Sequence, residues 1–576
     1  MEYNNYAIVF NWEIINDYPD IGKWEMLFEE DEKEVIGEGM SEFLETLSQL
    51  SLQEVNIMYV NNLNLFEVIG ANYMSYNYGF MAGVKDGTIN FFQLRPFEFI
   101  EFRNWNLYWE DCENCKEFLK RLNACRENFK GKNKNKLSIK SHYRFTLSKD
   151  MWTDLTERFY LKSSWSKPFR EALLPKDEIE LDLYLRVNKA SFMFLNPEYA
   201  NQTLNNIYMD DISSSHSGFM YRKKYPYEAA QQIEDIEDFY KIIEDDFHAW
   251  IAEIEFVDLY EKFDLRIDLR QFGYLNEDDN WVLILTNAHW KTFKRLFGAK
   301  DIIPHHFRYF KQKELVKNYA IMFSELYEEK ETFKKAFKEG RQPAWICNLF
   351  KFRTELPFGQ SIKSPTYYQT VYYDEEKNEF FKMKTEPESF EDIVKRIDKN
   401  VMPFQVGIWT AAYSWAEEVN MILDLGVDNV VYADTDSVAY INKDGIEIIK
   451  NHNKEIDKEV YRISSKRNMT ISPKLGRWQH KGCFNKFKAI NIKWYMYEEN
   501  GEIEVKAAGA IIDKLKEQLL KEEDPFNAFC RDVYGKDIFK NISISKETGT
   551  VHVSYNNFMG ELIERRLNQM TNGYFI

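Results

Sequence analysis

The spacing of apolar and polar residues predicts both helices and strands along this chain, and four segments show it most clearly. Residues 325–340 carry lysines on one side and end in glycine, and residues 411–426 also end in glycine, so each predicts a helix that stops at its glycine. Residues 367–383 alternate β-prone residues around a polar centre, and residues 429–440 do the same around a turn, so each predicts a β-hairpin. We therefore expect helices mixed with antiparallel strands.

The predicted hairpin over residues 429–440 carries two carboxylates at its tip, because the hexapeptide YADTDS at residues 432–437 contains Asp434 and Asp436. Like charges about 4 Å apart repel by about 4 kcal/mol at an effective dielectric of 20, so a pair between apolar strands favours a bound divalent cation. Magnesium prefers few carboxylates together with water and substrate phosphate oxygens, as in polymerase sites. An ordinary aspartate-rich turn is the alternative.

The length of the chain and its cysteine content indicate the broad class of protein. A chain of 576 residues with six cysteines favours several subdomains and reduced thiols over a small disulfide-linked domain. No apolar run reaches the roughly 20 residues that span a bilayer, and the N-terminus lacks a basic-then-apolar signal, so we expect a soluble cytoplasmic protein. Cys112, Cys115 and Cys125 have part of the spacing of a zinc knuckle but no fourth ligand, so we expect ordinary thiols.

The net charge of −18 argues at first against a nucleic-acid enzyme, since phosphate binding needs a cationic surface. The distribution of charge changes this picture. Residues 1–50 hold thirteen acidic residues against two lysines, whereas residues 462–493 hold nine cations and no acid, with aromatic residues between them. The basic segment therefore suits a nucleic-acid backbone, although a solvated basic face has the same composition.

The hexapeptide at residues 432–437 resembles the third polymerase motif of family B DNA polymerases, Tyr-x-Asp-Thr-Asp-Ser. In that family an earlier Asp-x-x-Ser-x-Tyr-Pro segment supplies the other metal ligand, and residues 211–217 resemble it in part. Residues 220–227 are similar to the protein-primed type of small tailed bacteriophages. The resemblance implies these catalytic and metal-binding residues: Asp211, Asp434 and Asp436.

Residues that face the incoming nucleotide are implied in the same way. The fingers motif of the family, Lys-x-x-x-Asn-Ser-x-Tyr-Gly, is similar to residues 351–359, although residues 355–357 depart from it. A lysine at these positions offsets triphosphate charge; a core helix and a solvated lysine are the alternatives. The implied nucleotide-binding residues are Ser214, Ser215, His216, Lys330, Lys351, Phe358 and Gly359.

Contacts to the primer and template are implied further along the chain. Residues 474–478 and 493–495 resemble the Lys-x-Tyr element that holds the primer terminus, and residues 506–509 resemble the start of the thumb. The implied DNA-binding residues are Thr435, Lys493 and Tyr495.

The first 200 residues resemble the family poorly. There the family carries a proofreading 3′–5′ exonuclease whose two metals are held by four acids. The corresponding positions are Asn11, Glu13, Phe66 and Asn188, which leave one acid of four. The resemblance thus implies a degenerate exonuclease domain without activity; unrelated strands and helices are the alternative.

The implied fold class is α+β: a polymerase right hand of palm, fingers and thumb, preceded by a degenerate RNase H-like 3′–5′ exonuclease domain. The implied boundaries are 1–195 for the exonuclease-like domain, 196–222 and 401–495 for the palm, 223–315 for an insertion like the terminal-protein region, 316–360 for the fingers, 361–400 for a second insertion with the hairpin, and 496–576 for the thumb.

The implied function is template-directed DNA synthesis by a monomer that replicates a phage genome in the host bacterial cytoplasm. The implied cofactors are two Mg²⁺ ions, for which Mn²⁺ can substitute. The implied partners are DNA template and primer, dNTPs and a terminal protein that primes synthesis, with no membrane. Two alternatives belong to other classes: a catalytically silent nucleic-acid-binding protein derived from a polymerase, and a metal-dependent nuclease using the same carboxylates.

Overall fold

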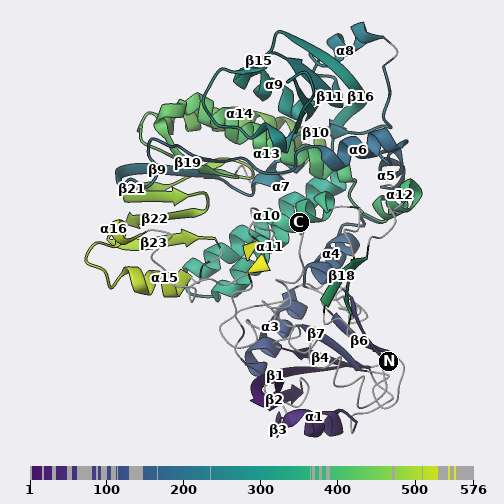
Figure 1. Ribbon diagram of the computed structural model, residues 1–576, viewed down its shortest axis with the longest axis vertical. Coiled ribbons are helices and arrows are strands. Elements are labelled where there is room, and N and C mark those ends of the chain that lie inside the picture. Colours follow the sequence, from purple (N-terminus) through teal and green to yellow (C-terminus); the bar gives the residue numbers. More distant parts are fainter. Residues whose placement is uncertain are drawn as a thin grey trace. The chain divides into compact units, whose positions relative to one another are not determined.

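The structure is a computed structural model with two compact units, Met1–Tyr160 and Leu161–Ile576 (Figure 1). It describes residues 3–15, 18–28, 34–48, 55–60, 81–85, 88–92, 100–104, 112, 114–128, 147–164, 166–233, 235–363, 365, 370–374, 379–383, 389–469, 474–508, 510, 512–529, 543–544 and 551–552.

The first unit is built on a seven-stranded mixed sheet with strand order β3-β2-β1-β4-β7-β6-β5. β1 runs antiparallel to β2 and parallel to β4, and β4 runs parallel to β7. The strands are β1 (Tyr3–Ile15), β2 (Tyr18–Phe28), β3 (Glu34–Glu38), β4 (Val55–Val60), β5 (Met81–Lys85), β6 (Thr88–Phe92) and β7 (Ile100–Asn104). The helices are α1 (Gly39–Ser48), α3 (Cys115–Asn128) and α4 (Leu147–Arg158).

Two of the three clustered cysteines, Cys112 and Cys115, are buried and form no disulfide with any described residue. The Cys115 thiol donates a hydrogen bond to the carbonyl oxygen of Ala7 on β1 at 3.2 Å, so it belongs to the core between α3 and the sheet. Cys112 is buried as well, while the side chain of Cys125 lies outside the described residues.

The second unit is centred on a seven-stranded sheet, hereafter the central sheet, of order β23-β22-β21-β9-β20-β19-β8. Its strands are β8 (Met193–Leu195), β9 (Leu204–Ile212), β19 (Val430–Asp434), β20 (Ser437–Tyr440), β21 (Trp478–Asn491), β22 (Trp494–Glu499) and β23 (Glu502–Ala507). One core cluster beneath it is Ile207, Met209, Val431, Tyr432, Ala439, Phe484, Phe487 and Ala489. Apolar residues from β9, β19, β20 and β21 thus join strands that are far apart in sequence.

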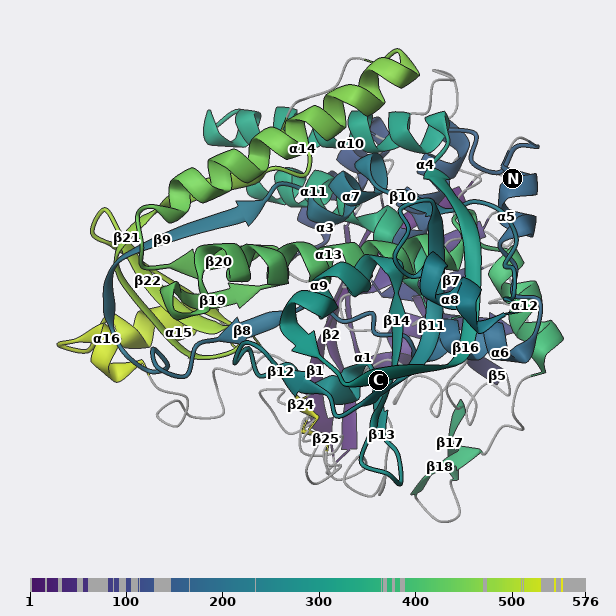
Figure 2. The ribbon, with the colours of Figure 1, turned by 90° about the horizontal axis from the view of Figure 1, so that it is seen from above.

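Five helices of the second unit carry the residues discussed below: α7 (Ser215–Arg222), α10 (Lys317–Lys338), α11 (Ala344–Ile362), α13 (Phe404–Leu425) and α14 (Gly445–Arg467). Figure 2 shows α13 beside β19 and β20, and α14 beside β9. The helix predicted over 325–340 is the second half of α10, followed by Gly340 at φ +69°. The helix predicted over 411–426 lies within α13 and stops at Gly426 at φ +85°. Both glycines hold a backbone conformation that disfavours other residues.

Both predicted hairpins are confirmed. β19 and β20 pair antiparallel, with Asp434 opposite Ser437 across a turn of two residues. β17 (Thr370–Asp374) and β18 (Glu379–Met383) form the other hairpin.

The second unit also contains another larger sheet and several shorter elements. A five-stranded sheet of order β10-β16-β11-β14-β13 follows α7 in the chain. Its strands are β10 (Lys224–Pro226), β11 (His248–Val257), β13 (Gly273–Leu275), β14 (Trp281–Thr286) and β16 (Asp301–Glu314). The other elements are α5 (Lys167–Ala172), α6 (Glu178–Arg186), α8 (Ile236–Ile242), β12 (Tyr260–Glu261), η3 (Leu269–Gln271), α9 (Asn287–Leu296), β15 (Phe297–Gly298), α12 (Phe390–Asp398), η4 (Val427–Asn429), α15 (Ile512–Leu519), α16 (Pro525–Ala528), β24 (Ser543–Ile544) and β25 (Val551–His552).

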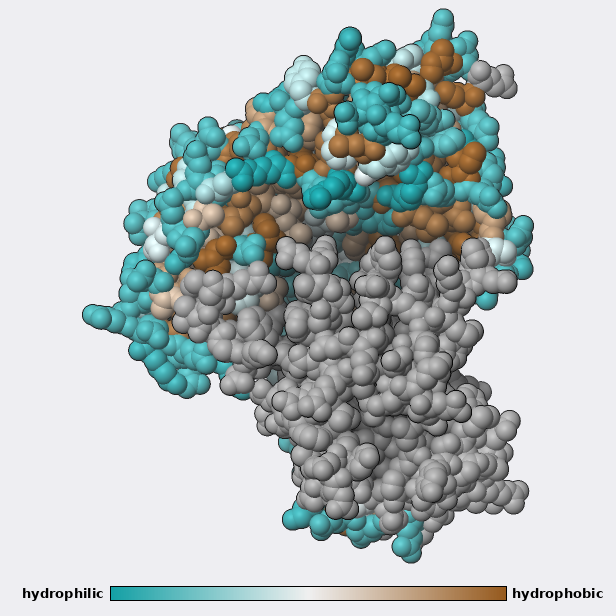
Figure 3. Space-filling view, in the orientation of Figure 1, coloured by the Kyte–Doolittle hydropathy of each residue, from teal (hydrophilic) through white to brown (hydrophobic). Residues whose placement is uncertain are grey.

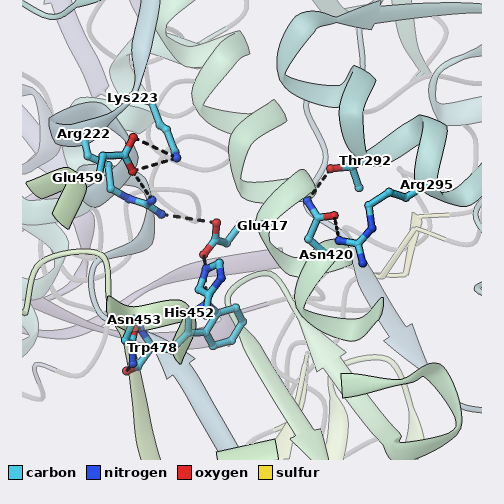
Figure 4. A network of polar contacts seen from close by, with 10 residues as sticks. All are labelled: Arg222, Lys223, Thr292, Arg295, Glu417, Asn420, His452, Asn453, Glu459 and Trp478. Carbon is cyan, nitrogen blue, oxygen red and sulfur yellow. Dashed lines mark hydrogen bonds and ion pairs between the residues drawn. The ribbon is translucent and has the colours of Figure 1, made fainter. Parts of the chain in front are cut away.

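A buried charge network joins α7 to α13 and α14 (Figure 4). The guanidinium of Arg222, 2% exposed, lies 2.9 Å from the Glu459 carboxylate and 3.6 Å from that of Glu417. Glu417 Oε1 also accepts hydrogen bonds from His452 at 2.6 Å and from the Trp478 indole at 3.2 Å. Arg222 is the last residue of α7, the helix that follows Asp211. The network therefore holds α7 against α13 and α14, close in sequence to one of the predicted acids.

The surface of the second unit on the face drawn in Figure 3 is mostly hydrophilic, with apolar side chains scattered between polar ones. Scattered apolar residues are ordinary for a protein surface. Within the described part of the chain, no helix has the length and apolar character to cross a membrane.

Candidate active site

The three predicted acids come together at one edge of the central sheet. Asp211 is the second-last residue of β9 and lies opposite Ser437 in the register of β9 with β20. The backbone N–H of Ile212 donates to the carbonyl oxygen of Asp436 at 2.7 Å, which ties β9 directly to the hairpin tip. Thr435 adopts φ +63° between the two aspartates of the tip. The strands therefore bring Asp211 beside Asp436 although 225 residues separate them.

The structure also distinguishes Asp211 from its neighbour Asp210, which points to the opposite face of β9. Asp210 is 3% exposed, and its Oδ2 accepts hydrogen bonds from the Tyr440 hydroxyl at 2.7 Å and from His480 at 3.1 Å. Asp211 is half-buried, and its carboxylate lies 2.7 Å from the Lys481 ammonium. The Asp210 carboxylate is thus buried and bound by Tyr440 and His480, whereas Asp211 faces the hairpin tip.

The electrostatics of the tip favour a cation. Burial, followed by the negative charges of Asp211 and Glu355, raises the pKa of Asp436 to about 7, against the opposing charge of Lys351. Asp434 is held by hydrogen bonds to Oδ1 from the Thr435 hydroxyl at 3.0 Å and to Oδ2 from the Tyr432 hydroxyl at 3.4 Å. Burial and neighbouring negative charges favour the protonated form of Asp436. A bound metal ion would supply a positive charge and so favour the ionised form.

The donor set fits Mg²⁺ bound by two carboxylates and substrate oxygens rather than by a closed protein cage. Among the described residues, no group of three or more His, Cys, Asp or Glu side chains is arranged to hold a metal ion. Magnesium commonly uses only one or two carboxylates, with water and phosphate oxygens completing its octahedron. Asp211 and Asp436 offer such a pair of hard oxygen ligands, and the Lys481 ammonium now neutralises one of them.

Cationic and aromatic groups from α10 and α11 face this acidic edge. The Lys330 ammonium on α10 donates to the Ser214 hydroxyl at 2.5 Å, and burial lowers the pKa of Lys330. Lys351 on α11 opposes the charges of Asp436 and Glu355, so it lies on the same side. A buried hydrogen bond from the Ser217 hydroxyl to the Thr354 carbonyl oxygen, 2.7 Å, joins α11 to α7. Lys330 therefore lies within electrostatic range of Asp211, and Lys351 within range of Asp436.

The remaining predicted nucleotide contacts lie in the same region. The His216 ring stacks on Phe358 with centroids 3.8 Å apart and planes 8° from parallel, and burial lowers the pKa of His216 to about 4. Gly359 follows Phe358 on α11 and is exposed. The Ser215 hydroxyl at the start of α7 is buried and makes no hydrogen bond to the described residues. Burial therefore keeps the His216 imidazole neutral where it stacks on Phe358.

Lys493 and Tyr495 approach the hairpin from the other end of the central sheet. The Lys493 backbone N–H donates to the Tyr432 hydroxyl at 2.9 Å, and the ring centroids of Tyr495 and Tyr432 are 5.0 Å apart. Burial, with further contributions from Asp434, Asp211 and Asp436, raises the pKa of Tyr495. Tyr495 therefore stays a neutral hydroxyl beside the acids, and Lys493 is exposed at the edge of the sheet.

Two residues that the sequence did not single out as site residues belong to this neighbourhood. Lys481 pairs with Asp211 as described above. Glu418 on α13 is 0% exposed, and neither carboxylate oxygen makes a hydrogen bond to any described residue. Burial, followed by the charges of Asp436 and Asp434, raises the pKa of Glu418 well above its ordinary value. In the sequence Glu418 is one polar residue of the helix predicted over 411–426, so only the packing of α13 against β19 and β20 reveals it.

The structure describes the backbone at three of the four predicted exonuclease positions. Asn11 and Glu13 lie on β1 of the first unit, and Phe66 falls outside the described residues. Asn188 belongs to the second unit, is buried, and accepts a hydrogen bond at Oδ1 from the backbone N–H of Ala190 at 2.8 Å. The absence of exonuclease activity stays a prediction.

No protein-family model and no curated protein sequence matches the chain. Among solved structures, the chain is similar to Phi29 DNA polymerase complexed with primer-template DNA, with a TM-score of 0.63, 15% identity, and coverage of 90% of this chain and 94% of that one. For Phi29 DNA polymerase complexed with single-stranded DNA the TM-score is 0.62 and the identity 15%, and the match covers 89% of this chain and 93% of that one. For the ternary complex of Phi29 DNA polymerase with primer-template DNA and incoming nucleotide the TM-score is 0.58 and the identity 15%, and the match covers 90% of this chain and 94% of that one. The chain therefore has a mixed helix-and-sheet fold like that of Phi29 DNA polymerase over nearly its whole length.

Proposed function

We propose that the protein is a DNA-directed DNA polymerase. The observation that carries the proposal is the meeting of Asp211 and Asp436 at the edge of the central sheet, with Lys330 and Lys351 on the facing helices. The likeness of the fold to Phi29 DNA polymerase supports it, since the solved relatives are complexes with primer-template DNA and nucleotide.

The proposed reaction is attack of a primer 3′ oxygen on the α-phosphorus of a dNTP. A new phosphorus–oxygen bond forms, the bond to the β-phosphate bridging oxygen breaks, diphosphate leaves, and the hydroxyl proton passes to solvent. Two Mg²⁺ ions held by Asp211 and Asp436, with Asp434 completing the shell or holding it through water, would stabilise the attacking and leaving oxygens, and Mn²⁺ can substitute. Lys330 and Lys351 offset the charge of the triphosphate, Ser214 and Ser215 contact its oxygens, and Phe358 with Gly359 packs on the new base pair.

The duplex side of the proposed site uses the hairpin and the strand edge behind it. Thr435 and Tyr495 lie near the acids, and the exposed Lys493, two residues before Tyr495, can bind a phosphate of the primer strand. Extension of a labelled primer by the purified chain separates this proposal from its rivals. A silent nucleic-acid-binding protein binds the duplex without extending it, and a nuclease shortens the primer.

We further propose that priming uses a hydroxyl of a separate terminal protein. Resemblance to the protein-primed family supports this, together with the two insertions that it implies at residues 223–315 and 361–400. In the structure the first of these carries the five-stranded sheet, and the second carries the β17–β18 hairpin and α12. The test mixes polymerase, the cognate terminal protein, Mg²⁺ and labelled dATP. Covalent label on the protein supports the proposal, and label only on added oligonucleotide primers refutes it.

We also propose that the exonuclease-like domain predicted over residues 1–195 does not proofread. The chain places amides at Asn11 and Asn188 and an apolar ring at Phe66 where the family has metal-binding acids. A neutral amide does not offset a divalent charge, so Glu13 alone holds too little negative charge for two metals.

A further inference from the structure

Lys481 lies in a bulge of β21, on the part of this strand that pairs with β9 (Figure 2). The antiparallel register shifts between His480 and Gly482, which leaves Lys481 without a Cα partner on β9. A bulge of this kind bends the strand and re-aims a side chain. The Lys481 ammonium lies 2.7 Å from Oδ2 of Asp211. The fold therefore brings one cation of the basic segment to one of the proposed metal ligands.

The strand that carries Lys481 is anchored, whereas its side chain reaches solvent. The backbone N–H of Trp478 donates to Oδ1 of Asn453 at 3.0 Å, and the Asn453 amide donates to the Trp478 carbonyl oxygen at 2.9 Å. Both of these bonds are buried, while the side chain of Lys481 is 39% exposed and that of Asp211 is 31% exposed. A lysine can keep its stem on the protein while its charged end enters water. The ammonium of Lys481 can therefore leave Asp211 without movement of β21.

A second cation, Lys330, also acts on Asp211, but other contacts hold it in place. The charge of Asp211 contributes to the pKa of Lys330, which burial lowers. The Lys330 side chain is 13% exposed, donates to the Ser214 hydroxyl, and lies 3.6 Å from the Glu331 carboxylate. Among the residues that the structure describes, Asp211 is the one acid within ion-pair distance of Lys481. Lys481 is therefore the cation of the site that depends on Asp211 and is able to move.

The same carboxylate oxygens serve an ammonium ion or a divalent metal ion. The two cations repel each other at close range, so Lys481 has to leave Asp211 when a metal ion binds there. With both carboxylates ionised, Asp211 and Asp436 carry two negative charges, and Lys481 offsets one of them. A metal ion is attracted less strongly to the pair with Lys481 than to the pair alone. Oxygens from a phosphate ligand are then needed to complete a firm site.

We propose that Lys481 is a tethered counter-ion that competes with divalent metal for Asp211 and thereby sets the metal affinity of the site. Lys481 acts through Asp211, so it is a positioning residue. The consequence is that free metal binds weakly, and that firm binding needs the phosphate oxygens of a nucleotide as well. This consequence rests on the proposed polymerase function, whereas the competition for Asp211 is a property of the chain alone.

The first test measures Mn²⁺ binding to the purified full chain, without DNA or nucleotide, from the electron paramagnetic resonance of free Mn²⁺. The quantity compared is the affinity of the Mn²⁺ that is lost in Asp211→Asn, because an acidic chain also binds Mn²⁺ elsewhere. Lys481→Met should bind this Mn²⁺ about tenfold more tightly than the parent, since binding no longer breaks a charge-assisted contact. A merely structural role for Lys481 would leave the affinity unchanged or weaken it. Either of those results, or no such Mn²⁺ in Lys481→Met at millimolar concentration, overturns the proposal.

Three further variants show whether the effect belongs to the contact between Lys481 and Asp211. Lys481→Arg keeps the positive charge and should bind Mn²⁺ like the parent. Lys486→Met is the matched control, because Lys486 lies on the same strand, is 47% exposed, and pairs with Glu498 at 3.9 Å. It should also bind like the parent, and an equal gain in Lys486→Met would contradict a specific role for Lys481. The gain should disappear in Lys481→Met/Asp211→Asn, and a gain that persists there places the effect at another site.

The second test separates this inference from the proposed function by primer extension over a Mg²⁺ series. Lys481→Met should reach its half-maximal rate at a lower Mg²⁺ concentration than the parent. If Lys481→Met gains Mn²⁺ affinity through Asp211 while neither chain extends a primer, the counter-ion role is supported and the polymerase function is wrong. If the parent extends primers, and both the Mg²⁺ dependence and the Mn²⁺ affinity are unchanged in Lys481→Met, the polymerase function stands and the counter-ion role is refuted.

Discussion

Replacing Arg222 with methionine tests whether the buried network behind the acidic site stabilises the second unit. Arg222 is 2% exposed and lies between Glu459 at 2.9 Å and Glu417 at 3.6 Å. Removing one partner of a buried ion pair costs about 3–5 kcal/mol, because a buried charge loses its counter-charge. We expect the lower part of that range, about 3 kcal/mol, since Glu417 keeps its hydrogen bonds from His452 and Trp478.

A second substitution should recover much of that loss. Both retained hydrogen bonds end on Glu417 Oε1, so Glu417→Gln keeps their acceptor while removing the charge that faced Arg222. The combination Arg222→Met/Glu417→Gln should therefore be more stable than Arg222→Met alone. Arg295→Met is the matched control, because Arg295 pairs with Asp424 at 2.8 Å on the surface, where such a pair is worth at most about 1 kcal/mol.

The assay is hydrogen exchange of peptides from α13 and α14 across a urea series, which reports the free energy of opening for these helices alone. Local measurement matters because a chain of two compact units need not unfold in one step. If Arg222→Met leaves the opening free energy of both helices within about 1 kcal/mol of the parent, or if the double variant is no better than the single one, the network does not stabilise this region.

Three further predictions concern sugar selection, a buried acid and proofreading. His216 is smaller than the tyrosine that the family places there, and its ring stacks on Phe358, so the enzyme should exclude ribonucleotides less strongly than a polymerase with that tyrosine. The measurement compares single-nucleotide incorporation of dNTP and rNTP. Discrimination as strong as that of such a polymerase, and unchanged in His216→Ala, removes His216 from this role. Because burial and nearby carboxylates raise the pKa of Glu418, folding stability should fall as pH rises above about 4.5. Glu418→Met should make this fall less steep and should stabilise the protein by about 1–3 kcal/mol at neutral pH, and a less stable variant contradicts this. Degradation of 3′-labelled single-stranded DNA with Mg²⁺ or Mn²⁺ should be absent; excision that is lost in Glu13→Ala but kept in Asp434→Asn refutes the prediction.

The sequence predicted the hairpin tip well because its signals are local. Apolar strand residues flank a short polar turn, and the structure has β19 and β20 in those places with Asp434 opposite Ser437. The helices ending at Gly340 and Gly426 were equally local, since a glycine in a left-handed conformation marks the end of each. The motif at residues 211–217 matched the family less well than the hexapeptide at 432–437. The register of β9 with β20 was needed to show that Asp211 rather than Asp210 faces the tip.

Other parts of the site depend on packing that a single sequence does not record. Lys481 neutralises Asp211 only because β21 pairs with β9, and nothing in the basic run around Lys481 singles it out from its neighbours. Glu418 is hidden for the same reason, since its burial depends on where α13 crosses the central sheet. The division after Tyr160 was also not visible, because no linker composition marks it.

The central claim is most directly tested by single-turnover primer extension with Asp434→Asn, Asp436→Asn and the adjacent control Asp210→Asn. An asparagine at 434 or 436 keeps the shape of the hairpin but removes negative charge from the proposed metal site, so each variant should lose about a thousandfold or more of the extension rate. Asp210→Asn retains an oxygen that accepts from Tyr440 and should extend primers at close to the parental rate. Extension by Asp434→Asn or Asp436→Asn at near the parental rate, with both variants folded, would contradict the assignment of these carboxylates to nucleotidyl transfer.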